Sequence, residues 1–563
     1  MVNSGTNIHS LSYTITLILL AASIPLSKFT MSITEFMLLG LWLWSGFSFN
    51  VSYRFFKIGG VIGIFQLIAY IASLGYNNLI EKFTLFYRNK PALIFISIYV
   101  IHILGVIYTS DYDYAVKDLR IKVPLLLLPI IISTMPKINS KHLRILLLIY
   151  TFAVLANTII SMYVYLTGLY VDIRDISLFI SPIRLGLNVS FSFFILIYFI
   201  FHDGKFKIWQ IAGFVIMGLW FLSFLFLLEA VTSIVIILLA GISYLFIRLL
   251  NTMVIWQKIV LLSIVVAIPA LFFLNVRNVI IDATTAPDIE FSILDKQTNL
   301  GNNYIHDTIN LEVEDGKYVG LYLCYEELRD SWNKRSSIDY NENTAAGYQV
   351  SSTLIRYLTS CDLRKDAEGV ASLTSEDIYL IEQGVANCNY VKSPGFRTRI
   401  LKMIMGYEVY RQTGNPSGSS VMQRYEYMRA AFKIIGNNFL FGVGTGDLEN
   451  AFYAEFTAMN SFLEDQYRYH AHNQFLGIFV AFGLLGFVIF MIGMVYPPIA
   501  LSGFKDFYFS IFFFIMIVSM LSDDTIETQA GATMFAFFYS LLLFGRKVGD
   551  QMPARLKTDK HLD

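Results

Sequence analysis

The residues best suited to chemistry are two histidines, His470 and His472, which stand directly before a long apolar run. Histidine titrates close to neutral pH and can take a proton from a hydroxyl group. We therefore consider His472 as a general base at the boundary between water and lipid, supported by His470 and Asn473; polar anchoring at the membrane surface is the alternative. Because side chains two residues apart on a helix point to different faces, and the nearby sequence offers no third ligand, no metal site is expected.

Two arginines suggest a second kind of chemistry, the binding of phosphate. Arg184 lies in the string SPIRLGLN at the start of an apolar run, and Arg424 lies near the start of an amphipathic segment, VMQRYEYMRAAFKII. The guanidinium group presents forked donors to phosphate oxygens and stays charged. Arg184 could instead reach the lipid headgroups, Arg424 could sit on a solvated surface, and Arg429 competes for the same role. Placed with His472 at the outer membrane surface, the two arginines would hold a lipid diphosphate.

The composition places these residues in a membrane protein. Of the 563 residues, 55% are hydrophobic and 15% are charged, against roughly 25% charged residues in a typical soluble domain. The 42 acidic and 42 basic residues balance, which excludes a nucleic-acid-binding protein that works by bulk positive charge. Residues 276–471 hold 26 acidic and 18 basic residues, a net charge of −8, so the rest of the chain carries +8.

Apolar runs predict twelve membrane-spanning helices, because about 20 apolar residues in a helix cross the roughly 30 Å hydrocarbon core. Nine precede the acidic stretch and three follow it. They are Leu11–Leu26, Met31–Phe49, Ala92–Tyr108, Val123–Met135, Leu143–Leu166, Leu185–Phe201, Ile208–Leu228, Thr232–Leu250, Ile255–Leu274, Gln474–Tyr496, Phe507–Leu521 and Gly531–Phe544. A further run, residues 59–76, either lies in the interface or adds a thirteenth span; we prefer twelve spans.

The orientation follows from lysine and arginine, which gather in loops on the cytoplasmic side. Loops such as the one with Lys137, Lys141 and Arg144 all fall on one side when the spans alternate, together with the C-terminal tail 546–563. The predicted organisation is nine spans in residues 1–275, one large outward loop over 276–471, the last spans in 472–545, and a cytoplasmic tail.

The outward loop is expected to be mostly helical. Helical spacing of apolar residues predicts short helices over Tyr318–Trp332, Thr353–Leu363, Glu376–Gln383 and Val421–Ile435. Before His470 comes the string NNFLFGVGTGD, whose glycines at 442, 444 and 446 predict a tight backbone turn. The same glycines could cradle a phosphate, but they do not follow a strand in a βαβ unit, as a nucleotide-binding fingerprint would.

The segment from Arg424 to Gly486 resembles the O-antigen ligase and polymerase family of integral membrane glycosyltransferases. Three strings carry the resemblance: RYEYMRAAFKII, then NNFLFGVGTGD, then AHNQFLGIFVAFGLLG. Upstream, SDYDYAVKDLRIKVPLLLLPII is similar to the early segment of the family, and the order of spans, large loop and further spans is also shared. The resemblance implies an all-α, GT-C-like integral membrane fold in the bacterial inner membrane, with the large loop in the periplasm.

The resemblance further implies that a glycan moves from an undecaprenyl-diphosphate carrier to an acceptor hydroxyl on the periplasmic face, with inversion at the anomeric carbon and without a metal or cofactor. His472 would deprotonate the acceptor, and Arg184 and Arg424 would bind the diphosphate. The chain departs from the family where a Ser-Arg pair is common near the start of a mid-chain span: it has LLEAVTSIV, with Glu229 and no arginine. Either fewer cations bind the diphosphate, or Glu229 has another supporting role near the outer surface.

Several alternatives stay open. Within the family, the acceptor could be the lipid A core, another glycan chain (a polymerase) or a hydroxyl of an exported protein (an oligosaccharyltransferase). A transporter or flippase would instead require polar residues paired inside spans, and an inverted repeat. A sensor or scaffold would not require the His-Asn string at the membrane surface. The expected partners are the lipid-linked donor, its acceptor and membrane lipids, and no nucleic acid.

Overall fold

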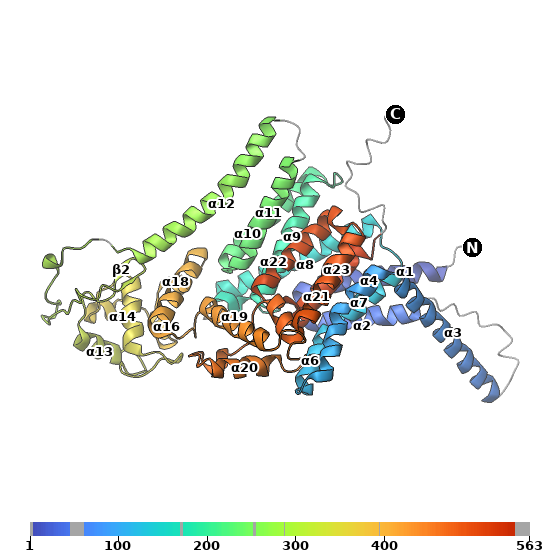
Figure 1. The fold of residues 1–563 in the computed structure, drawn as a ribbon. Helices are drawn as coiled ribbons and strands as arrows, with labels where there is room; N and C mark the ends of the chain where they lie inside the picture. The colour runs from blue at the N-terminus through green and yellow to red at the C-terminus, as the bar shows by residue number, and fades with distance from the viewer. Residues whose placement is uncertain are drawn as a thin grey trace.

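The computed structural model describes residues 4–45, 61–168, 173–250, 255–286, 288–392 and 395–546. These residues form a bundle of apolar helices and a smaller body that projects from one end of it (Figure 1). The helices up to the outward loop are α1 (Ser4–Leu26), α2 (Lys28–Trp44), α3 (Val61–Arg88), α4 (Lys90–Phe95), α5 (Ser97–Gly105), η2 (Val106–Tyr108), α6 (Tyr112–Lys122), α7 (Pro124–Thr134), α8 (Ser140–Thr167), η3 (Ile173–Ile176), α9 (Pro182–Phe201), α10 (Ile208–Leu227), α11 (Val231–Leu250) and α12 (Ile255–Thr284).

The elements of the loop and of the C-terminal part follow in the same order. They are η4 (Phe291–Ile293), β1 (Val313–Glu314), β2 (Lys317–Tyr318), α13 (Tyr325–Asn333), α14 (Val350–Ser360), α15 (Ala367–Ala371), α16 (Ser375–Glu382), α17 (Asn389–Lys392), α18 (Phe396–Thr413), α19 (Ser420–Asn437), α20 (Leu448–Ala458), η5 (Asp465–Tyr467), α21 (Gln474–Ala500), η6 (Gly503–Lys505), α22 (Phe507–Ser522), η7 (Thr525–Glu527) and α23 (Gln529–Leu543).

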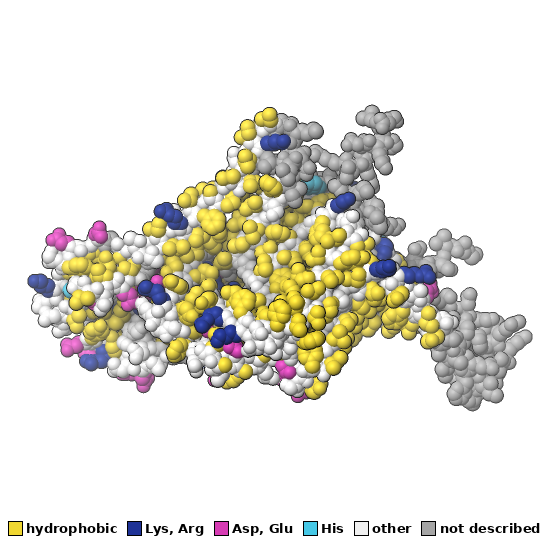
Figure 2. Space-filling view, in the orientation of Figure 1, with side chains coloured by type: hydrophobic (Ala, Val, Ile, Leu, Met, Phe, Trp, Pro, Cys, Tyr) yellow, Lys and Arg dark blue, Asp and Glu magenta, His cyan; other side chains and the backbone are white. Residues whose placement is uncertain are grey.

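The described residues include seven helices that are long and apolar enough to cross a membrane. They are Ile8–Leu26, Lys90–Tyr108, Ser140–Thr167, Pro182–Phe201, Ile208–Leu227, Ile255–Thr284 and Gln474–Ala500. Three shorter apolar helices, Val231–Phe246, Phe507–Ser522 and Gln529–Leu543, match further predicted spans. Figure 2 shows a broad hydrophobic face over the bundle, with charged side chains near its edges and over the outward body. The prediction of a helical multi-pass membrane protein is confirmed.

The number of spans stays a prediction. Two of the twelve predicted spans correspond to α2 and α7, and α7 has 11 residues, which rise only about 16 Å in a helix. Residues 61–76 of the additional run lie in α3, which projects from the bundle in Figure 1 and contacts α4 and α7. Residues 59 and 60 of that run, and the predicted tail after Arg546, lie outside the described residues.

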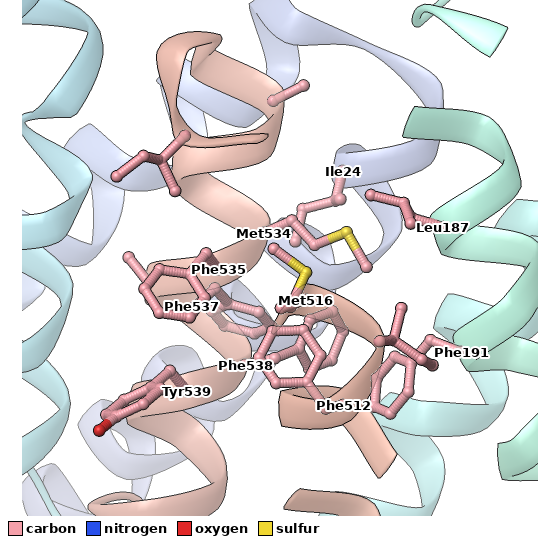
Figure 3. Packing of buried hydrophobic residues seen from close by; sticks show 14 of the residues in the cluster. Ile24, Leu187, Phe191, Phe512, Met516, Met534, Phe535, Phe537, Phe538 and Tyr539 are labelled. Carbon is pink, nitrogen blue, oxygen red and sulfur yellow. The ribbon is translucent and has the colours of Figure 1, made fainter. Parts of the chain in front are cut away.

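An aromatic core joins the helices whose ends carry the candidate site. Phe191 of α9, Phe512 of α22 and Phe538 of α23 meet with ring centroids 5.0–5.5 Å apart (Figure 3). All residues of α23 from Ala530 to Leu543 are buried, as expected of a helix that is apolar on every face. Close packing of this kind fixes the positions of the helix ends.

The predicted loop over residues 276–471 holds the helices α13 to α20 and long irregular stretches between them, and the part that projects from the bundle has a core of its own that includes Trp332 and Tyr357. The predicted helix over Tyr318–Trp332 is wrong in its first half, because α13 begins at Tyr325. Leu323 is extended and exchanges backbone hydrogen bonds with Ile305, at 2.7 and 3.0 Å. Tertiary pairing therefore overrides the helical spacing of the preceding residues.

The glycine-rich string forms the predicted tight turn and packs against a kink in α21. Gly442 and Gly444 have φ of 70° and 99°, and α21 is kinked at Gly483, where φ is 61°. The amides of Val443 and Gly444 donate to the carbonyls of Val480 and Ala481, at 3.0 and 2.9 Å. Because these amides are used within the backbone, the turn supports α21, the helix that follows His472, and does not present them to a phosphate.

Candidate active site

The site lies where the start of α21 and the end of α22 meet α18 and α19, two helices of the loop over residues 276–471 (called the insert below). A cavity of about 530 Å³ opens between them. Its lining residues are Tyr407, Tyr410, Val421, Met422, Arg424, Tyr425, Met428, Ala471, His472, Asn473, Leu476, Leu521 and Ser522. Two of the three residues predicted to act on the substrate, His472 and Arg424, therefore share one cavity.

His472 is held beside an aspartate by the helix that follows it. Its Nδ1 lies 3.3 Å from Oδ2 of Asp524, and its side chain is 34% exposed. Asn473 caps α21, because its Oδ1 accepts from the amide of Leu476 at 3.0 Å and its Nδ2 donates to the carbonyl of Leu521 at 2.8 Å. With Nδ1 turned to the carboxylate, Nε2 is the nitrogen left to take a proton from a substrate.

Asp524 also binds the second histidine. Nε2 of His470 lies 2.7 Å from Oδ2 of Asp524. Burial alone would raise the pKa of Asp524, but hydrogen bonds and charge from the two imidazoles lower it well below its usual range. Burial would lower the pKa of His470, and the hydrogen bond and charge of Asp524 outweigh this and raise it. Asp524 thus stays ionised near neutral pH, so it can orient His472 and stabilise its protonated form.

Arg184 lies in the first turn of α9, and its donors face the turn between α22 and α23. Its guanidinium binds the carboxylate of Asp523, the main-chain oxygen of Asp524 at 3.1 Å and the hydroxyl of Thr528 at 3.2 Å. The side chain is buried and is not among the residues that line the cavity. Arg184 therefore contacts the aspartate pair beside His472.

Arg424 brings a partly buried cation to the cavity, close to a second one. Burial lowers the pKa of Arg424, the charges of Asp523 and Asp524 oppose that shift, and the charge of Arg174 adds to it. Arg174 lies in η3, in the connection between α8 and α9, and lines a neighbouring hollow of about 460 Å³ together with Pro182. The charges of Arg424 and Arg174 therefore act on one another, with the carboxylates of Asp523 and Asp524 also within range of Arg424.

The remaining supporting residues lie outside the cavity lining. Arg429 pairs with Glu426 on α19, with Nη1 and Oε1 2.6 Å apart. Glu229, at the turn between α10 and α11 with φ of 54°, accepts from the amide of Gly395 at 3.2 Å and lies 3.7 Å from Nζ of Lys402. Glu229 thus joins the membrane helices to the start of α18, in line with a role other than phosphate binding.

One group among the described residues could bring three ligand atoms to a metal ion. Ligand atoms of His472, Asp523 and Asp524 lie within 4.8 Å of one another. The two carboxylates already bind the guanidinium of Arg184 and the imidazole of His470. Cations of the protein therefore balance the negative charge of this group.

A buried ion cluster fixes the turn that carries the aspartates. Lys122, at the end of α6, binds both Asp118 and Glu527. Gln474 donates from Nε2 to Glu527 at 2.7 Å and accepts from the amide of Ile526 at 2.9 Å. This cluster connects the η7 turn to α6 and to Gln474, the first residue of α21. It thereby keeps Asp524 beside His472.

Sequence reasoning missed the aspartate pair and Arg174. The string DDTIE, which contains Asp523, Asp524 and Glu527, stands between two apolar runs, and ionisable residues at such a place are candidates for a functional site. No local pattern in the sequence places them beside His472. Arg174 precedes Arg184 by ten residues, and only the folded connection brings it near α19.

The fold and the cavity define a polytopic helical membrane protein with a histidine and an arginine in one cavity at the ends of its helices. Residues 386–491 match the family model described as O-antigen ligase, and this match spans both Arg424 and His472. No curated protein matches the chain significantly. The predicted resemblance is confirmed over residues 386–491: this part of the chain matches the O-antigen ligase family, which supports a ligase- or polymerase-like membrane enzyme and implies a lipid-linked glycan and an acceptor as substrates in general.

Proposed function

We propose that the protein transfers a glycan from an undecaprenyl-diphosphate carrier to an acceptor hydroxyl at the periplasmic face of the bacterial inner membrane. The observation that carries this proposal is that His472 and Arg424 line one cavity, between the start of α21 and the helices α18 and α19. One of these groups can take a proton, and the other can bind a phosphate. The family match over the same residues supports the same chemistry.

The reaction proceeds by direct attack of the acceptor. The acceptor oxygen forms a bond to the anomeric carbon while the bond from that carbon to the diphosphate oxygen breaks, and its electron pair leaves with the diphosphate. The proton of the acceptor passes to Nε2 of His472, and Asp524 stabilises the resulting imidazolium. Arg424 and Arg174 neutralise the charge that grows on the leaving group. A single displacement of this kind inverts the anomeric centre.

Arg184 has a different part in this proposal from the one that its sequence suggests. Its guanidinium binds Asp523, Asp524 and Thr528, so we assign it to positioning the aspartates and not to the diphosphate. Arg174 takes the place of the second phosphate-binding cation. Arg174 lines a different hollow from His472 and Arg424, but its charge acts on Arg424, so it is the candidate for the cation that the mid-chain string lacks.

The net charge of the outward loop indicates which class of acceptor is favoured. Residues 276–471 carry a net charge of −8, which disfavours an anionic, phosphorylated lipid A core. Another glycan chain, or a hydroxyl of an exported protein, is favoured on this ground.

The test is transfer in proteoliposomes that contain a synthetic polyprenyl-diphosphate glycan and each of the three acceptor classes. His472→Ala and Arg424→Ala should lower the rate by about 10²- to 10⁴-fold, the usual scale of general-base and electrostatic contributions. His142→Ala, near the start of α8 at the opposite end of the bundle, and Arg411→Ala, on an exposed face of α18, are the matched controls. Wild-type rates in both site variants would refute the residue assignment, and a carrier left unconsumed with every acceptor would refute the function.

A further inference from the structure

Three tyrosines from the insert form one wall of the cavity that holds His472 and Arg424. Tyr407 and Tyr410 come from α18, and Tyr425 comes from α19. Tyr407 is 52% exposed and Tyr425 is 45% exposed. Large aromatic faces are thus open beside the two groups to which we assign the chemistry.

Contacts within the insert hold this tyrosine wall in place. The hydroxyl of Tyr410 donates to Oε1 of the buried Glu426 at 3.0 Å. Glu426 also binds Arg429, whose guanidinium carbon lies 5.8 Å from the ring centroid of Tyr425. The rings of Tyr410 and Tyr425 meet edge to face at 6.1 Å. The ring of Tyr425 is therefore held by the Tyr410 ring and the Arg429 guanidinium before any ligand binds.

The backbones under the wall are fixed as well. A Cβ atom at Gly406 would collide with the side chain of Ser419, the N-cap of α19, so α18 and α19 pack closely there. Arg399 of α18 donates to the hydroxyl of Ser420 at 2.7 Å. In Figure 1 the two helices lie between the outward body and the bundle. A wall that is rigid in the free protein binds a ligand at a low cost in conformational entropy.

We infer that the tyrosine wall is the binding subsite for the first sugar ring of the lipid-linked donor. The inference rests on the proposed function and names the part of the donor that this wall recognises. One oxygen atom joins that sugar to the diphosphate, so a diphosphate at Arg424 places the ring in the cavity that Tyr425 also lines. A pyranose ring has an apolar C–H face, which can pack on the face of an aromatic ring.

The opposite side of the cavity accounts for the lipid part of the donor. Leu476 of α21 and Leu521 of α22 line it there, and both helices are apolar and suited to the membrane. The isoprenoid chain would thus lie against Leu476 and Leu521, the diphosphate at Arg424, and the sugar against the tyrosines. The cavity thus offers apolar side chains, a cation and aromatic rings, which are the groups that the three parts of the donor require.

Binding measurements on the full chain in nanodiscs test this inference. The probes are polyprenyl diphosphate that carries one N-acetylhexosamine and the same polyprenyl diphosphate without sugar. Tyr425→Ala should weaken binding of the sugar-bearing probe by about three- to tenfold, the scale of an aromatic contact, and leave binding of the bare carrier unchanged within about twofold. Tyr425→Phe should bind like wild type. Tyr379→Ala, at an exposed tyrosine of α16 in the outer part of the insert, is the matched control.

The outcomes separate the inference from the proposed function. If Tyr425→Ala weakens both probes equally, the wall holds the isoprenoid chain, and the inference is overturned. If both probes bind wild type and Tyr425→Ala changes neither affinity, the wall is no subsite, and the inference is overturned while the proposed function stands. Wild type that binds neither probe more tightly than phosphatidylglycerol overturns both. Selective loss of the sugar-bearing probe supports the inference.

Discussion

Replacing Asp524 by asparagine should lower the transfer rate while the fold is kept. At 3.3 Å from Nδ1 of His472, a unit negative charge stabilises an imidazolium by about 5 kcal/mol at an effective dielectric constant of about 20. Because His472 is one-third exposed, solvent screening leaves about half of this, roughly 2–3 kcal/mol. Such a loss in the transition state corresponds to about a 30- to 150-fold lower kcat.

The assay for this prediction is the initial rate of transfer in proteoliposomes, together with the melting temperature of the same preparation. Asp524→Glu restores the charge and should recover part of the rate. Asp465→Asn removes an exposed carboxylate of η5 that pairs with Arg468, and should leave the rate unchanged. If Asp524→Asn keeps the wild-type melting temperature and transfers glycan at the wild-type rate, Asp524 does not act through the base, and the reasoning fails.

Three further predictions concern stability. Arg184→Met should cost about 3–5 kcal/mol, because its buried carboxylate partner is left unpaired, and a denaturation curve measures the loss; a cost below about 1 kcal/mol would contradict it. Gly442→Ala should destabilise the protein by about 1–3 kcal/mol because of its positive φ and the nearby α21 backbone, whereas Gly436→Ala, in open space on α19, should not. The raised pKa of His470 predicts that its stabilising pair with Asp524 is fully formed below the unfolded value of 6.5 and weakens as pH rises through the folded value. His470→Asn should therefore lose more stability at about pH 5.5 than at about pH 9; an equal or larger loss at high pH would contradict the pairing.

The fold class and much of the candidate site could be predicted because they depend on local patterns in the sequence. Runs of about 20 apolar residues identify spans without knowledge of their neighbours. His472 and Arg424 stand in strings that mark the family, and both line the same cavity. Glycine spacing predicted the turn before α21, because positive φ at Gly442 and Gly444 is a local property of the backbone.

The rest depends on contacts between distant segments. The η7 turn places Asp524 beside His470, which is more than 50 residues away in sequence. No periodicity in the sequence predicts such a contact. For the same reason, the sequence gives the position of Arg184 at a helix end but not the direction of its donors. The early start expected for α13 fails because Leu323 pairs with Ile305, a long-range interaction that a helical pattern does not contain.

The most direct test of the proposed function is a cryo-EM structure of His472→Ala with the polyprenyl-diphosphate glycan bound. We predict that the oxygens of the diphosphate lie within hydrogen-bonding distance of Arg424 and Arg174, and that the anomeric carbon faces the position of the missing imidazole. A diphosphate bound elsewhere on the molecule, with the cavity between α19 and α21 empty, would contradict the account.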